Sequence, residues 1–171
     1  MAKKNRVLRE AKIDTSHHWA IVSHLRPHQL AFRINEKCGL NLHRLKSISS
    51  VGKTKLPGFA LFNDQQNDMQ PDFYLIALKE DTHVLVKELK QFDYVLQVRL
   101  PDEDSLWDAA LMIQNIRSIE NVLGVFEINI ETIKNIDVLF FDKELDKLEL
   151  GVEVEKRVKI KHIIKKNERD N

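Results

Sequence analysis

The segment Tyr94–Leu100, YVLQVRL, constrains the fold of this chain more than any other. Every second side chain, from Tyr94 to Leu100, is apolar, and a period of two is that of a β-strand with one face in the core. Pro101 follows and ends the strand, because proline lacks the N–H that a ladder needs. The segment is therefore expected to be part of a half-buried sheet.

The residues after this strand predict a helix. Their apolar positions recur at spacings of three and four, which form one stripe along a helix; they are Leu106, Ala109, Ala110, Ile113 and Ile116. A capping box of Ser105 with Asp108 starts the helix, or Asp104 alone is the cap. Gly124 is the expected stop.

A second strand follows that helix. The segment Val125–Ile130 alternates, and we expect it to bury Phe126, Ile128 and Ile130. Strand, helix and strand together form a β-α-β unit.

An earlier β-α-β unit is predicted at residues 18–45. The apolar segment His18–Ser23 favours a strand, and Pro27 suits the first position of a helix. Gly39 ends that helix. Leu40–Leu45 is then expected to return as a strand beside the first.

A β-hairpin is predicted between the two units. Phe59–Phe62 and Phe73–Leu78 are apolar, and the polar, turn-rich residues 63–72 join them. The order β-α-β, β-hairpin, β-α-β predicts an α+β fold related to the ferredoxin-like arrangement. We expect a mostly antiparallel sheet with two helices packed on one face.

The length and composition fit one such domain. The chain has 171 residues, 43% of them apolar and 31% charged, which is enough for one hydrophobic core. We expect a basic N-terminal arm at 1–12, a single α+β domain at 13–147 and a charged extension at 148–171. We expect residues 148–162 to form a β-hairpin before a basic tail, and a basic helix from 155 onward is the alternative.

The sequence also favours a cytoplasmic location. No run of about 18 apolar residues indicates a membrane span. The basic N-terminus lacks the apolar stretch of a secretory signal. The single cysteine, Cys38, cannot form an internal disulfide and is expected to be a buried thiol.

The net charge of +1 hides an uneven distribution. The two ends, 1–12 and 156–171, hold 12 of the 27 basic residues and 3 of the 26 acidic ones, which leaves a body with a net charge of −8. Basic ends can neutralise nucleic-acid phosphates; the candidate contacts are Lys3, Lys4, Arg6, Arg9, Lys12, Lys159, Lys161, Lys165 and Lys166. We favour solvated tails, because no aromatic residue accompanies the N-terminal basic ones to stack on a base.

One segment imitates a phosphate-binding loop. Ser47–Thr54, SISSVGKT, ends like that loop, but Ser47 stands where its first glycine is required. Pro57 and Gly58 exclude the helix that would have to follow Thr54 to hold a phosphate. We interpret the match as chance.

The seven histidines and the many carboxylates predict no metal or catalytic site. His24 and His28 are four residues apart, but Pro27 begins the helix between them, so His24 lies outside it. His17 and His18 point to opposite faces of a strand. No Gly-x-Ser-x-Gly turn is present to hold a nucleophile. We assign no catalytic residue, no metal ligand and no cofactor.

The segment Val86–Tyr94, VKELKQFDY, places three polar residues at the start of the alternating strand. Glu88 and Asp93 can accept hydrogen bonds from backbone N–H groups of the connecting turn. Tyr94 can place its ring in the core and its hydroxyl at a polar rim. A structural clamp is the favoured interpretation, and a catalytic group is the alternative.

In this segment the sequence resembles the bacterial IPExxxVDY family. The Glu, Asp and Tyr of the segment match the family signature, Val86 and Phe92 are apolar replacements, and Lys87 stands where the family has proline. Leu30–Arg44 is similar to the family's first helix and second strand, and the resemblance covers residues 14–130. It implies that Glu88, Asp93 and Tyr94 are structural or binding residues, and it implies no reaction.

These features together favour a non-enzymatic domain that binds a small molecule or a protein chain. We expect a homodimer in which the sheet extends across a twofold axis. Nucleic-acid association through the basic termini is the alternative, and an enzyme using Glu88, Asp93 and Tyr94 is a third hypothesis.

The nucleic-acid hypothesis predicts binding that depends on salt. If the termini neutralise four phosphates of a single-stranded oligonucleotide, the affinity falls about fiftyfold between 50 and 200 mM salt. Removal of residues 1–12 and 156–171 should abolish binding. Fluorescence anisotropy at both salt concentrations measures this, and salt-insensitive binding would reject the hypothesis.

Overall fold

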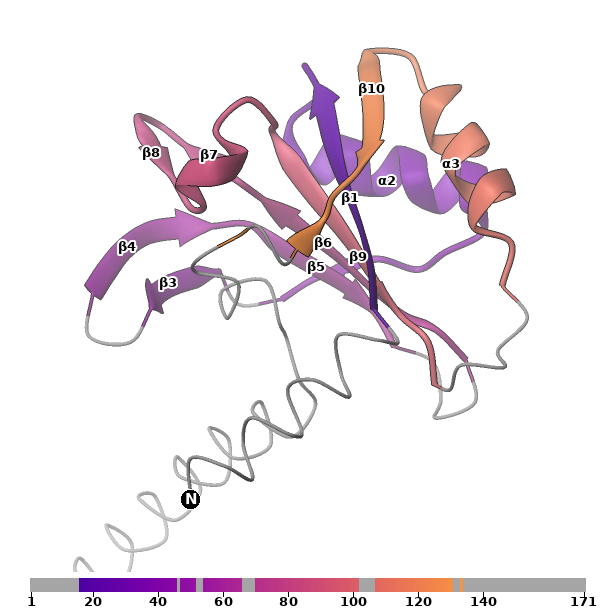
Figure 1. Ribbon diagram of the computed structural model, residues 1–171, viewed down its shortest axis with the longest axis horizontal. Coiled ribbons are helices and arrows are strands. Elements are labelled where there is room, and N and C mark those ends of the chain that lie inside the picture. Colours follow the sequence, from indigo (N-terminus) through magenta and orange to yellow (C-terminus); the bar gives the residue numbers. More distant parts are fainter. Residues whose placement is uncertain are drawn as a thin grey trace, which may run out of the picture. The chain divides into compact units, whose positions relative to one another are not determined.

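Figure 1 shows a computed structural model of the chain. The structure describes residues 16–45, 47–51, 54–65, 70–101, 107–130 and 133. All of them belong to one compact unit, Met1–Leu139.

Six strands of the described residues form one sheet, in which every neighbouring pair is antiparallel. In spatial order they are β10 (Val122–Glu127), β1 (Ser16–Ser23), β9 (Tyr94–Arg99), β6 (Asp72–Ala77), β5 (Leu61–Asp64) and β2 (His43–Arg44). The predicted hairpin is the pair β5 and β6, and the predicted antiparallel sheet is confirmed.

Two helices, α2 (Pro27–Cys38) and α3 (Ala109–Arg117), pack on one face of this sheet (Figure 1). Their buried stripes contact the strand residues that alternate toward them, among them Trp19, Ile21, Leu75, Leu96 and Val125. The expected α+β class, with both helices on one face, is therefore confirmed. None of the described helices is long and apolar enough to cross a membrane.

Local signals define both ends of α2. Pro27 is its first residue, where a missing N–H costs no hydrogen bond. At its end Gly39 adopts a φ of 69°, in the left-handed region that glycine enters without a Cβ clash. The N–H of Gly39 donates to the carbonyl of Asn35 at 3.0 Å and completes the last turn.

The sheet face opposite the helices is also buried. Ala20, Val95 and Ile76 form a cross-strand row on that face, and none of the three is exposed. Strands that are buried on both faces are continuously apolar. This fits the apolar run Leu75–Ala77 of β6, a strand in which all six residues are buried.

Two short hairpins and one turn of 3-10 helix were not predicted. The hairpins are β3 (Ile48–Val51) with β4 (Thr54–Phe59), and β7 (Lys79–Glu80) with β8 (His83–Val84); the 3-10 helix η1 is Lys87–Leu89. Because Thr54 begins a strand, the prediction that no helix follows it is confirmed.

The expected place of the strand at Leu40–Leu45 is wrong. The strand is only His43–Arg44, and it pairs with β5 at the far edge of the sheet. The position beside β1 belongs to β9, whose residues are buried on both faces, as expected for a strand at the centre of a sheet. His43 and Arg44 are exposed, as befits an edge.

The expected stop of α3 and the expected face of the last strand are also wrong. The helix ends at Arg117, and Gly124 lies inside β10. Val125 is 2% exposed and faces the helices because it pairs with Ile21, so its neighbour Phe126 points to the other face and is 51% exposed. The expectation that Ile130 is buried is confirmed.

The start of α3 lies later than predicted, at Ala109, with Asp108 as the N-cap. The alternative cap residues 104 and 105 lie outside the described residues. Asp108 Oδ1 accepts a hydrogen bond from the N–H of Leu111 at 2.8 Å, which satisfies one of the open donors of the first turn.

Removal of this cap should destabilise the fold. Asp108→Ala is expected to lower the free energy of unfolding by about 1 kcal/mol, the usual value of an N-cap acceptor. Urea denaturation followed by circular dichroism measures it. Asp108→Asn keeps an acceptor oxygen at this position and should lose less; an equal loss in both variants would contradict the assignment.

Candidate functional site

The three signature residues separate in the structure. Glu88 lies on η1, is exposed, and makes no hydrogen bond or ion pair with any described residue. Asp93 immediately precedes β9, and Tyr94 is the first residue of that strand. The structure therefore joins Asp93 and Tyr94 to a polar network and leaves Glu88 outside it.

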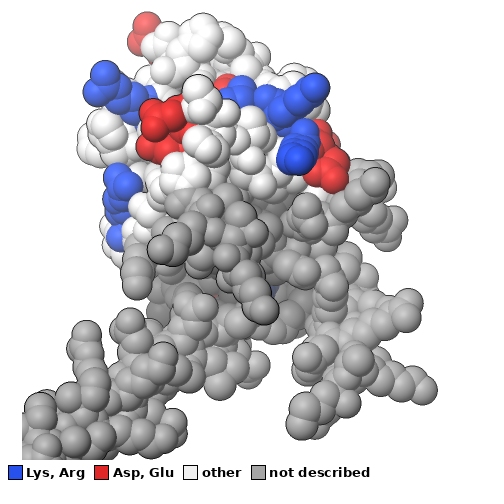
Figure 2. All heavy atoms as spheres, turned by 90° about the vertical axis from the view of Figure 1, so that its left-hand side faces the viewer, with Lys and Arg blue, Asp and Glu red and all other residues white. Residues whose placement is uncertain are grey.

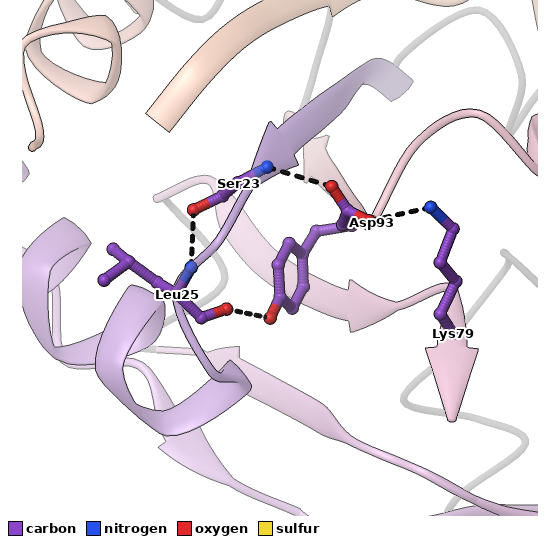
Figure 3. A network of polar contacts seen from close by, with 5 residues as sticks. Ser23, Leu25, Lys79 and Asp93 are labelled. Atoms are coloured by element: carbon purple, nitrogen blue, oxygen red, sulfur yellow. Dashed lines mark hydrogen bonds and ion pairs between the residues drawn. The ribbon is translucent and has the colours of Figure 1, made fainter. Parts of the chain in front are cut away.

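Asp93 connects three segments of the chain (Figure 3). Its Oδ2 accepts from the N–H of Ser23 at 3.0 Å, and its Oδ1 accepts from Lys79 Nζ at 2.8 Å. Its own N–H donates to the carbonyl of Ile21 at 3.0 Å, and its carbonyl accepts from the N–H of Leu78 at 2.8 Å. Each polar group of Asp93 thus has a partner.

Ser23 extends the network to the turn between α3 and β10. Its Oγ donates to the carbonyl of Asn121 at 2.9 Å and accepts from the N–H of Leu25 at 3.1 Å. The N–H of His24 also donates to the carbonyl of Asn121, at 3.1 Å. The end of β1, the start of β9 and the α3–β10 turn are therefore held together.

Tyr94 ties the same region to the start of α2. Its ring is buried in the core, and its hydroxyl donates to the carbonyl of Leu25. Burial raises the pKa of Tyr94 to about 12, with further contributions from the charges of Asp93 and Glu80. A phenol with this pKa stays protonated at neutral pH and does not suit acid–base catalysis there.

The network resembles the clamp that the sequence suggested, with different partners. Asp93 was expected to bind the connecting turn, whereas its backbone donor is Ser23, 70 residues earlier. Ser23, Lys79 and Asn121 were missed. Local spacing carries no signal for them, because the contacts depend on which strands become neighbours.

His17 and His18 take structural positions in β1. His17 stacks on Trp19 with ring centroids 5.7 Å apart, and His18 lies buried on the opposite face of the sheet. Burial, and then the charge of His17, lower the pKa of His18 to about 4. Within the described ranges, no group of three or more His, Cys, Asp or Glu side chains can hold a metal ion.

Cys38 lies at the end of α2 and packs against the core. Burial raises the pKa of its thiol to about 11. The thiol is therefore protonated at neutral pH and is a poor nucleophile.

The candidate nucleic-acid contacts all lie outside the described residues. On the face that Figure 2 shows, the described Lys and Arg side chains lie among Asp and Glu side chains. The part of the chain that the structure describes thus presents charges of both signs on this face.

Comparisons of the chain with protein-family models, with curated proteins and with solved structures find no significant match.

The hydroxyl of Tyr94 should stabilise the fold. Tyr94→Phe removes the hydrogen bond to Leu25 and leaves a partly buried carbonyl without that donor, so we expect a loss of about 1 kcal/mol in the free energy of unfolding. Chemical denaturation at pH 7 measures this loss.

The pH dependence provides the control. The pKa of Tyr94 is raised in the folded state, so its contribution is complete below pH 10 and is lost between pH 10 and about 12. Stability should fall less steeply over this range in Tyr94→Phe than in the parent chain. Identical alkaline profiles would contradict this role.

Proposed function

We propose that the chain is a non-enzymatic α+β binding domain that associates with a second copy of itself through α3 and β10. The observation that carries this proposal is the location of exposed apolar side chains. The two further observations below, on the sheet edge and on the polar network, support it.

Large apolar side chains are exposed on α3 and on β10, where Phe126 points to the sheet face opposite the helices. Among the described residues, four large apolar side chains are more than half exposed: Phe32, Leu111, Leu123 and Phe126. Three of them lie on α3 and β10, which pack against each other. Concentrated apolar surface on a monomer is typical of a protein–protein interface.

The edge of the sheet at β10 limits how a partner can bind. The carbonyl of Ile21 accepts a hydrogen bond from the N–H of Asp93, so the backbone polar groups of Ile21 point toward β9. Ile21 and its partner Val125 on β10 are therefore a non-hydrogen-bonded pair. As a result, the N–H and carbonyl of Val125 point away from β1, toward the outer edge of the sheet. Arg117 Nη2 donates to the carbonyl of Val125 at 2.7 Å.

A second feature interrupts the same edge. The register of β10 against β1 shifts between Val22 and Ser23, which indicates a bulge at this end of the strand. A strand of a partner molecule could therefore form only a few backbone hydrogen bonds with β10. We place most of the association free energy in the apolar side chains rather than in a long shared sheet.

The role of the polar network also favours binding over catalysis. The carboxylate of Asp93 accepts hydrogen bonds from Ser23 and Lys79, and the hydroxyl of Tyr94 donates one to the carbonyl of Leu25. These groups connect backbone segments. They support a structural role for the residues that resemble the IPExxxVDY signature, and membership of that family is part of our proposal.

We also propose that the domain is a relative of the ferredoxin-like arrangement, which follows the order β-α-β-β-α-β. The same order is found along the chain when β2 to β5 and the β7–β8 hairpin are treated as insertions. The elements that remain are β1, α2, β6, β9, α3 and β10. The four strands lie side by side as β10, β1, β9 and β6. Ferredoxin-like domains commonly act by binding, which is analogy at the level of the fold.

Self-association is tested with matched variants. We expect the full chain to sediment as a dimer at about ten micromolar, and Leu123→Glu to weaken the dimer at least about tenfold, because an unpaired charge would enter the contact. Phe32→Glu is the control, since Phe32 is similarly exposed but lies on α2. Analytical ultracentrifugation measures both variants.

Two outcomes would overturn the proposal. One is a monomeric parent chain at that concentration. The other is an equal loss of dimer in Leu123→Glu and Phe32→Glu, which would show that the α3–β10 surface is not the contact. Circular dichroism of each variant separates loss of association from loss of folding.

A further inference from the structure

Five polar side chains form one row across the sheet face opposite the helices. His18 pairs with Gln97, Gln97 with Tyr74, Tyr74 with Asn63, and Asn63 with His43. Residues directly opposite each other on antiparallel strands point to the same face. These five residues, here called the polar row, therefore extend from β1 at one side to β2 at the edge.

The polar row lies mostly inside the protein. Gln97 and Tyr74 have no exposed surface, and His18 and Asn63 are buried as well. His43, at the end of the row, is exposed on the edge strand β2. The row thus leads from the sheet surface near the centre of the molecule to solvent at one edge.

Two amides of the row have hydrogen-bonding atoms that no described residue satisfies. Gln97 Nε2 and Oε1 and Asn63 Oδ1 are buried, and none of the three has a partner among the described residues. Each such atom costs on the order of a hydrogen bond when it is removed from water. Gln97 and Asn63 are the direct neighbours of Tyr74 on its two sides, so these atoms lie in one region.

The hydroxyl of Tyr74 adds to this region. It accepts a hydrogen bond from Gln65 Nε2, the side chain of a third amide residue. The amides of Gln97 and Asn63, on the strands at either side of Tyr74, offer a donor and acceptors and carry no charge.

The surroundings of the row are close to neutral. The next row on this face contains Arg99 and Asp72, which are directly opposite each other and have opposite charges. The buried His18 is neutral at pH 7, because burial and His17 lower its pKa to about 4. The row is uncharged and the charges of the neighbouring pair sum to zero, so the site fits an uncharged ligand.

We propose that the polar row is a binding site for a small uncharged molecule with an amide-type edge, in which a hydrogen-bond donor lies next to an acceptor. Gln97 supplies the complementary donor and acceptor, as glutamine does when it pairs with the edge of a base. Asn63 supplies a further acceptor. The exposed His43 marks the side from which the molecule reaches the row. A nucleobase and a carboxamide both have such an edge.

Titration of the full chain tests this site and identifies the source of the edge. Uracil and nicotinamide are added separately up to about 10 mM, and binding is followed by NMR, with pyridine as the control that lacks the carboxamide. We expect saturable binding of one probe and none of pyridine. Uracil alone indicates a nucleobase, and nicotinamide alone indicates a carboxamide. Failure of both probes would overturn the proposal.

Variants at Gln97 separate a ligand site from a structural or hydrated amide. Gln97→Leu removes the unpartnered atoms at similar size, so it should weaken binding at least about tenfold without lowering the denaturation midpoint. Gln114→Leu, on the exposed surface of α3, is the matched control and should bind normally. Unchanged affinity in Gln97→Leu would overturn the proposal.

This site does not depend on self-association. Leu123→Glu should still bind the probe if the polar row is the site, whether or not it forms a dimer. A crystal structure of the full chain with the bound probe completes the test, and ordered water alone on Gln97 at saturating probe would contradict the inference.

Discussion

The burial of β9 on both of its faces is the constraint on which the rest of the structure depends. One face of this strand gives Tyr94, Leu96 and Val98 to the core under the helices, and the other gives Val95 and Gln97 to the opposite side of the sheet. Such a strand is stable only between two neighbours, and β1 and β6 fill these positions. The polar network at the start of β9 then fixes β1 and the residues that lead into α2 relative to it.

Much of the fold follows from local sequence, and the errors come from pairing between distant segments. Pro27 and Gly39 define α2 because helix ends depend on residues within one turn. The side of Phe126 depends instead on the pairing of Val125 with Ile21, about a hundred residues away. One residue of register reverses every side chain of a strand, so alternation alone could not decide which face is buried.

The same reasoning explains what the sequence showed of the candidate sites. The segment that contains Asp93 and Tyr94 was noticeable because acids stood before a buried strand. Nothing in the local sequence marks its partner Ser23, because hydrogen bonds between strand ends depend on the order of the strands in the sheet. Gln97 looked like an ordinary polar residue of an alternating strand. Its significance depends on Tyr74 and Asn63, which sheet formation places beside it.

The interrupted outer edge of β10 has a consequence for how copies of this chain can accumulate. An unbroken edge strand lets each added molecule expose the same edge again, and growth then continues into fibrils. With Arg117 occupying the carbonyl of Val125 and a bulge at the end of the strand, this repetition is stopped. In the self-association proposed above, an assembly therefore does not grow along this edge.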